Sequence, residues 1–94
     1  MGDFSVFVRG ENFLTDVDGV AQRVGFFTTC HVEAVSAELA GERAVGLLRA
    51  DPKLIGLARN PDDDPFRLVI EEVRPIETFA GLRLPRTGLA VFPE

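Results

Sequence analysis

Residues 23–50, RVGFFTTCHVEAVSAELAGERAVGLLRA, change their hydrophobic period part-way along. Up to Ala34 apolar residues alternate with others, and β-branched and aromatic types are frequent, which is the pattern of a half-buried strand. From Ala37 the apolar residues recur every three or four positions, as they do on one face of an α-helix. We therefore expect a strand over Arg23–Ala34 and a helix over Ala37–Ala50.

Local signals mark both ends of this helix. The Ser36 hydroxyl can accept a hydrogen bond from a first-turn amide, so Ser36 is a suitable N-cap. Asp51-Pro52 ends the helix, because a residue before proline is pushed out of the helical region. The same pair can begin a short second helix over Lys53–Ala58.

The apolar stripe of the main helix consists mostly of small residues, which let a helix lie close to its neighbour. Its members are Ala37, Ala40, Gly41, Ala44, Leu47 and Leu48. Gly41 and Gly46 each cost up to about 1 kcal/mol relative to alanine in a helix interior. This helix therefore depends on its packing against a sheet.

The residues before this stretch predict a hairpin. Phe4–Leu14 also alternates, with Gly10 as a bulge or a weak point. Asp18-Gly19 then lies between two alternating runs, and both residue types tolerate positive φ, so a tight turn is expected there.

A third strand is expected over Phe66–Val73, after a loop over residues 60–65, and Pro75 indicates a strand end or an edge strand. In the partly extended tail, residues 79–84 and 89–92 are two apolar pieces, either of which can form an extra short strand. A right-handed crossover returns the third strand beside the first. The prediction is a single α+β domain over residues 1–94 with a ββαβ, half-ferredoxin-like layout. Its sheet has three strands in the order 2-1-3 and carries the main helix on one face.

Composition narrows the classes of function. The chain has 94 residues and a formal net charge of −5, with no basic run, so nucleic-acid binding is not expected. Its single cysteine, Cys30, cannot form an internal disulfide. No signal-peptide pattern and no apolar run of about 20 residues occurs. We expect a cytoplasmic protein without membrane contact.

Strand alternation assigns side chains to two faces of the sheet. The helix-covered face is expected to hold Phe4, Val6, Phe26, Val32, Leu68 and Ile70. The opposite, open face is expected to hold Phe7, Arg9, Phe27, Thr29, His31, Glu33, Arg67, Val69 and Glu71, and these are the candidate binding residues. An apolar patch of this kind is usually covered or used.

The open face has three candidate covers. The tail can supply Phe79, Leu82 or Phe92, a second copy can pack sheet against sheet, or a ligand can lie there. We expect a homodimer, formed through this face or through a sheet edge.

Residues able to carry chemistry are few. Cys30 and His31 are neighbours on a strand, so their side chains point to opposite faces, and Cys30 is expected in the core. Residues 16–19 lack the spacing of a calcium loop. The acids of residues 62–64 with 71–72 can attract a hard cation, although adjacent acids in a loop are more often a solvated surface. No metal and no cofactor is predicted.

Arginines offer one further possibility for binding. Arg83 and Arg86 of the tail, with Arg74 and Arg67, can form an anion-binding patch, but scattered surface arginines are ordinary in proteins of this kind.

Residues 30–40, CHVEAVSAELA, with residues 69–76, VIEEVRPI, resemble the small archaeal ribosomal protein LX in pattern and order of elements. The likeness implies a small ferredoxin-like arrangement of strand, capped helix and strand. The acidic charge departs from the basic charge of a ribosomal protein, so no function or site is transferred from it.

Three functions are compatible with these features. The first is a non-enzymatic interaction or small-ligand-binding domain that acts as a homo-oligomer, with a basic protein or a small molecule as a further partner. The second is an enzyme with a pocket at an oligomer interface, in which His31, Glu33 and Glu71 serve as acid–base groups. The third is an acidic inhibitor of the immunity-protein or antitoxin kind.

Overall fold

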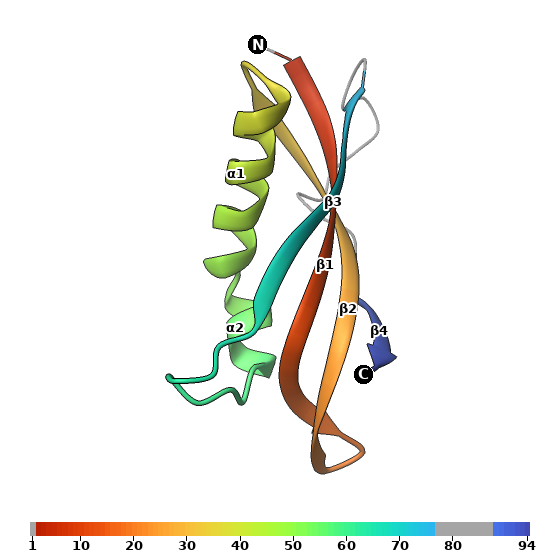
Figure 1. Cartoon of the computed structure of the whole chain (residues 1–94), viewed down its shortest axis with the longest axis vertical. Coiled ribbons are helices and arrows are strands. Elements are labelled where there is room, and N and C mark those ends of the chain that lie inside the picture. The colour runs from red at the N-terminus through yellow and green to blue at the C-terminus, as the bar shows by residue number, and fades with distance from the viewer. Residues whose placement is uncertain (1, 77–87) are drawn as a thin grey trace.

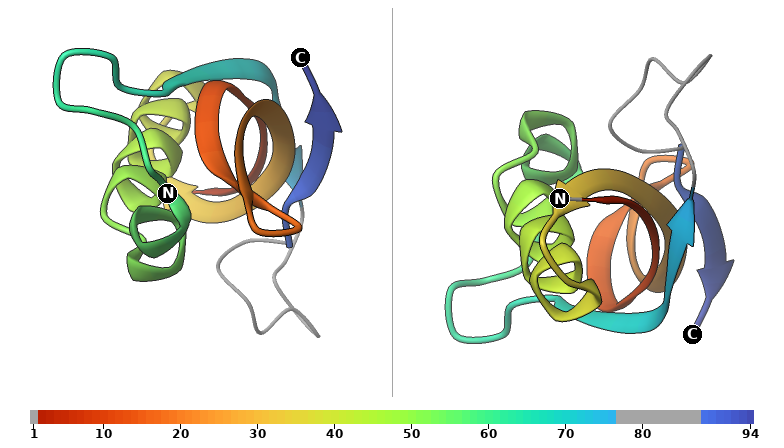
Figure 2. Two further views of the ribbon diagram at one scale, coloured as in Figure 1. Left: turned by 90° about the horizontal axis from the view of Figure 1, so that it is seen from below. Right: turned by 90° about the horizontal axis from the view of Figure 1, so that it is seen from above.

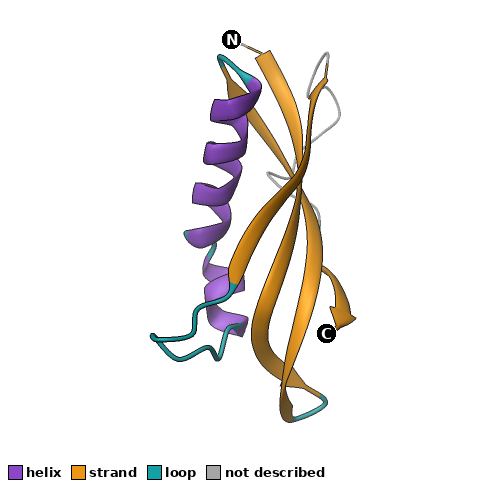
Figure 3. Ribbon diagram, in the orientation of Figure 1, coloured by secondary structure: helices purple, strands orange, loops and turns teal. Residues whose placement is uncertain are grey.

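The computed structural model describes residues 2–76 and 88–94. Six elements follow one another in Figures 1 and 3: β1 (Gly2–Val17), β2 (Val20–Ala34), α1 (Ala37–Arg49), α2 (Pro52–Leu57), β3 (Arg67–Ile76) and β4 (Ala90–Pro93). The three long strands, the main helix and the short helix all lie where the sequence predicts them, within a few residues. The α+β class is thereby confirmed.

A long hairpin of β1 and β2 forms the centre of the sheet. Val17 pairs with Val20 across the two-residue turn, in which Asp18 has φ 52° and Gly19 has φ 83°. Both angles are in the left-handed region that an Asp-Gly turn of a hairpin requires. The predicted turn is therefore confirmed.

The bulge of this hairpin lies two residues after the glycine. The register of β1 and β2 shifts between Gly10 and Phe13, and Asn12 has φ 56°. Gly10 itself remains paired with Phe26, whose ring lies where a side chain at position 10 would be. Gly10 thus permits close approach of a ring, and Asn12 supplies the unusual backbone conformation.

The sheet has four antiparallel strands in the order β3-β1-β2-β4, so the expectation of three strands was wrong. The order of the first three strands is as predicted. The extra strand, β4, is formed by the second apolar piece of the tail and pairs with residues 24–27 of β2. The ferredoxin-like layout is therefore matched only in part. The other apolar piece, residues 79–84, lies outside the described residues.

The small-residue stripe of α1 packs on the sheet as expected, but it is narrower than predicted. The Ser36 hydroxyl accepts a hydrogen bond from Leu39 N at 3.3 Å and so caps the helix. The buried residues of α1 are Ala40, Gly41, Ala44 and Leu48. Ala37, in the first turn, and Leu47 are exposed. Leu47 is turned away from the sheet because Leu48 takes the core position and neighbouring residues on a helix are about 100° apart.

The core lies between this helix and one face of the sheet. Val6, Val8, Phe26 and Leu48 are almost fully buried there, as is the Cys30 thiol. Ile70 was predicted to lie in this core, but it is 42 % exposed. It lies near Gly41 of the helix, on the edge strand β3, which has a neighbouring strand on one side only.

Figure 2 shows α1 and β4 on opposite sides of the β1–β2 hairpin. One face of the sheet therefore carries the helix, and the other carries side chains from β4. Among the described residues, no helix is long and apolar enough to cross a bilayer.

Candidate functional site

Three phenylalanine rings from three strands form a row on the face of the sheet away from α1, which we call the outer face. The rings of Phe7 and Phe27 are stacked with centroids 5.2 Å apart and planes 6° apart. Phe27 also contacts Phe92 of β4, with centroids 5.0 Å apart. Phe7 is 37 % exposed, and the other two rings are partly buried. This aromatic row is the apolar centre of the candidate site.

Gly25 is the reason that Phe92 can lie flat on this face. It pairs with Phe92, and a Cβ at position 25 would overlap the Phe92 ring. Phe92, one of three tail residues that were candidates to cover the open face, thus lies on it. Phe79 and Leu82, the other two, lie outside the described residues.

Ion pairs border the aromatic row on its β3 side. Arg9 Nε lies 3.3 Å from Glu71 Oε1, and Arg9 Nη2 lies 3.5 Å from Glu11 Oε2. The side chains of these three residues are only about one-third exposed. Such partial burial makes the pairs less screened by water and salt than pairs on an open surface. We call this set, together with Arg67, Glu72 and Arg74, the charged border.

The charged border includes a bulge in β3 and two further ion pairs. Phe7 pairs with Glu72 and Val8 with Ile70, so Glu71 is an extra residue in β3. Arg74 Nη2 lies 2.6 Å from Glu72 Oε1, and Arg67 Nε lies 3.8 Å from Glu11 Oε1. The border therefore contains three arginines and three glutamates, and its formal charge is zero.

A shallow hollow of about 310 Å³ adjoins the row beside Phe7. Its lining consists of Ser5, Phe7, Thr29, Glu72 and Arg74. The exposed ring of Phe7 is thus part of both the aromatic row and the lining of the hollow. Thr29 and Val69, both predicted site residues, are half-buried on the same face.

The proposed acid–base group is not brought together on one rung of the sheet. Its members are His31, Glu33 and Glu71. His31 pairs with Ser5 of β1, whereas Glu71 is inserted in β3 between the partners of Phe7 and Val8. The intervening strand separates the two by roughly 10 Å across the sheet. His31 and Glu33 border a second groove instead, between β2 and α1. Cys30, buried on the core face, does not join them.

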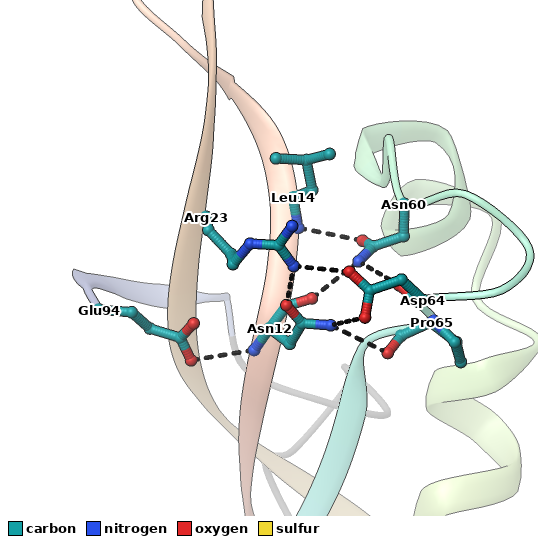
Figure 4. A network of polar contacts seen from close by, with 7 residues as sticks. All are labelled: Asn12, Leu14, Arg23, Asn60, Asp64, Pro65 and Glu94. Carbon is teal, nitrogen blue, oxygen red and sulfur yellow. Dashed lines mark hydrogen bonds and ion pairs between the residues drawn. The ribbon is translucent and has the colours of Figure 1, made fainter.

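Sequence reasoning missed a polar network that ties the 59–65 loop to the hairpin (Figure 4). Asn12 Nδ2 donates to Asp64 Oδ1 at 2.9 Å, and Arg23 Nη1 donates to both Asn12 Oδ1 and Asp64 Oδ2. Asn60 Nδ2 donates to the carbonyl oxygen of Asn12 at 2.8 Å, and Asn12 N donates to Glu94 Oε2 at 2.9 Å. The only local signal was Asn12 itself, a residue type that tolerates the left-handed region.

Electrostatics in this network favour the ionised form of Asp64. Hydrogen bonds from Arg23 and then from Asn12 hold the pKa of Asp64 below its ordinary value of 3.8. Asp64 is thus engaged by a guanidinium rather than available to a cation. Among the described residues there is no group of three or more His, Cys, Asp or Glu that could hold a metal ion.

Comparisons with protein-family models, with curated proteins and with solved structures return no match for the chain. Function is therefore inferred from the geometry of the chain alone.

Proposed function

We propose that this protein is a non-enzymatic interaction domain that forms a homodimer through the outer face of its sheet. The observation that carries the proposal is the aromatic row of Phe7, Phe27 and Phe92, which lies across three strands and is only partly covered. Aromatic residues supply large contact areas and are enriched in the centres of interfaces. Sheet-on-sheet packing would bury the row completely.

Charge argues for a second copy as the occupant. Each chain has a formal net charge of −5, so two copies repel one another over most approaches. The charged border is neutral, with arginines and glutamates interleaved. In a two-fold interface the same surface meets itself, and interleaved charges let an arginine of one copy face a glutamate of the other. A strongly basic partner would be better matched by a surface of one sign.

The alternative route, pairing through the outer edge of β3, is disfavoured by the strand itself. The bulge at Glu71 interrupts a regular ladder, and Pro75 removes a backbone donor. Charged residues flank both features. Bulges, prolines and charges are the devices by which natural sheets prevent edge-to-edge pairing. We therefore place the interface on the face.

The hollow lined by Phe7 belongs to the proposed interface. A two-fold rotation can bring the hollows of the two copies together, so that the Phe7 rings, each 37 % exposed in the single chain, are buried between them. Cytoplasmic location belongs to the same proposal, and it is supported by the single cysteine, Cys30, being a buried thiol.

Light scattering coupled to size exclusion tests the proposal with a matched pair of variants. Phe7→Lys places a charge in the aromatic row at a residue that is 37 % exposed, so the fold should persist. Ile55→Lys makes the same kind of change on α2, at a residue that is 54 % exposed. We expect a dimeric mass for the wild-type chain and for Ile55→Lys, and a monomeric mass for Phe7→Lys at the same concentration.

A wild-type chain that stays monomeric at the highest concentration tested, or a dimer that Phe7→Lys leaves unchanged, would refute the outer face as the interface. In the first case the tail or a ligand covers the row, and in the second the copies meet elsewhere. Circular dichroism of each variant confirms that it is folded before its mass is interpreted.

A further inference from the structure

A second concave surface lies on the helix layer, beside α1. It is a groove of about 420 Å³ between the end of β2 and the second half of α1. Its apolar lining is formed by Val32, Gly46, Leu47 and Ala50, and its polar lining by His31, Glu33 and Arg43. A volume of this size, mostly apolar walls and a few polar groups are the usual properties of a site for a small organic molecule.

Gly46 gives an independent sign that this groove has a use. A Cβ at position 46 would meet no atom within 4 Å, so packing does not explain the glycine. At Gly41, by contrast, a Cβ would lie 2.8 Å from Ile70 Cδ1. Glycine in a helix interior lowers stability, and a frequent reason to keep it is close approach of another molecule to the backbone. A residue that is unfavourable for its secondary structure and has no packing role there is expected mainly at functional sites.

Hydrogen-bond donors are gathered at one end of the groove. Arg43 Nη1 donates to the carbonyl oxygen of Glu33 at 2.8 Å, which fixes the guanidinium beside β2. That contact also shows that the Glu33 carbonyl points away from β1. A strand residue directs its N–H and C=O to the same edge, so the Glu33 N–H points toward the guanidinium side as well. A guanidinium beside a backbone N–H is a suitable receptor for a carboxylate.

We propose that this groove binds a small organic monocarboxylate, with the carboxylate on Arg43 and the Glu33 N–H and an apolar body over Gly46 and Leu47. The exposed Leu47, 48 % accessible, is then covered by the ligand. A single negative charge is specified because Glu33 lines the same groove and Glu42 is the neighbour of Arg43 in the chain, so that a second negative charge on the ligand would be repelled. The site lies on the helix layer and does not depend on the proposed dimer.

Titration of the full chain with octanoate, followed by amide chemical shifts, tests the proposal. We expect saturable shifts at Glu33, Gly46 and Leu47, with a Kd of about 1 mM for so small a ligand. Octanol has the same chain without the charge, and octylammonium has the opposite charge. Both should bind at least tenfold more weakly than octanoate.

Variants separate the charge from the apolar surface. Arg43→Gln should weaken octanoate binding at least tenfold, and Gly46→Leu should abolish it by filling the groove. Arg49→Gln is the matched control on the same helix, because Arg49 lies over the Phe66 ring at 5.9 Å rather than in the groove, and it should bind as the wild type does. Gly46→Ala, which fits the open space, replaces Gly46→Leu if the larger variant does not fold.

Three results would overturn the proposal. These are an absence of saturable shifts with octanoate at about tenfold the expected Kd, equal binding of octanol and octanoate, and unchanged binding by Arg43→Gln. Shifts confined to Phe7 and Phe27 would count against it as well, since they would place the ligand on the outer face.

Discussion

Asn12 makes several of the polar contacts that join the hairpin to the 59–65 loop. It is 7 % exposed, has φ 56° and donates to both Asp64 and Pro65. Asn12→Ala removes the side-chain contacts and places a Cβ-bearing residue without a compensating hydrogen bond in the left-handed region. We expect a loss of about 2 kcal/mol or more in the free energy of unfolding, measured by urea denaturation.

Asn12→Gly is the control for the backbone conformation. It loses the same hydrogen bonds, but glycine adopts positive φ without strain, so it should be about 1 kcal/mol more stable than Asn12→Ala. Equal stability of the two variants would mean that the positive φ carries no cost at this site, and the hydrogen bonds alone would then explain the choice of asparagine.

Asp64 gives the network a pH dependence. Hydrogen bonds from Arg23 and Asn12 hold the pKa of Asp64 below 3.8, so the unfolded chain takes up the proton more readily than the folded one. The contribution of Asp64 to stability is therefore present above that ordinary value and is lost as the pH falls through the lower pKa of the folded state. Asp64→Asn should flatten the fall in melting temperature between about pH 5 and about pH 2.

Asp62→Asn is the matched variant for this experiment, because Asp62 lies on the same loop outside the network. It should keep the wild-type slope of melting temperature against pH. An unchanged slope in Asp64→Asn would assign the acid sensitivity of the protein to other carboxylates.

Residues such as Asn12 and Asp64 mark the limit of prediction from the sequence. Hydrophobic alternation identifies which face a side chain takes, but it says nothing about which loop later folds back on it. The network joins residues separated by 52 positions in the chain, and no period connects them. The aromatic pair Phe7 and Phe27, in contrast, follows directly from alternation once the hairpin turn is identified.

Gly10 of β1 and Gly46 of α1 differ in the space around them, so substitution by alanine should change stability in opposite directions. Gly10→Ala forces a Cβ into the Phe26 ring, in a part of the core where Phe26 is fully buried, and should cost about 2 to 3 kcal/mol of stability. Gly46→Ala meets open space on a helix and should gain about 0.5 to 1 kcal/mol. Thermal or chemical unfolding of both variants measures the two effects.

Opposite signs for the two substitutions are the essential result. If Gly46→Ala were destabilising, something in the protein would already occupy the groove beside α1, and the proposed ligand site would lose its space. A neutral Gly10→Ala would mean that the Phe26 ring moves easily, contrary to its burial in the core.

The elements themselves were predictable to different degrees. The long strands and α1 have periods that persist over ten or more residues, so their existence and approximate bounds follow from the pattern. β4 has only four residues and no period of its own, and it becomes a strand because β2 offers it a partner. Alternation assigns Ile70 to the helix-covered face, but it does not reveal that this residue of an edge strand remains 42 % exposed beside α1.

At the scale of the whole molecule, the domain divides its accessible features between two surfaces. The outer face carries the aromatic row and a neutral charged border, and the helix layer carries the groove with Arg43. The aromatic row of the first lies across three strands, and we propose this surface as the one that meets a second copy of the chain. The central claim is therefore that two copies meet through Phe7 and Phe27.

Isotope-filtered nuclear Overhauser measurements on an equimolar mixture of labelled and unlabelled chains test that claim most directly, because they detect only contacts between copies. We predict intermolecular contacts that involve the ring protons of Phe7 and Phe27 and the residues of the neighbouring hollow. A mixture that forms dimers but shows intermolecular contacts only from α1 or from the β3 edge, or a mixture that shows none because the chain is monomeric, would contradict a dimer formed through the outer face.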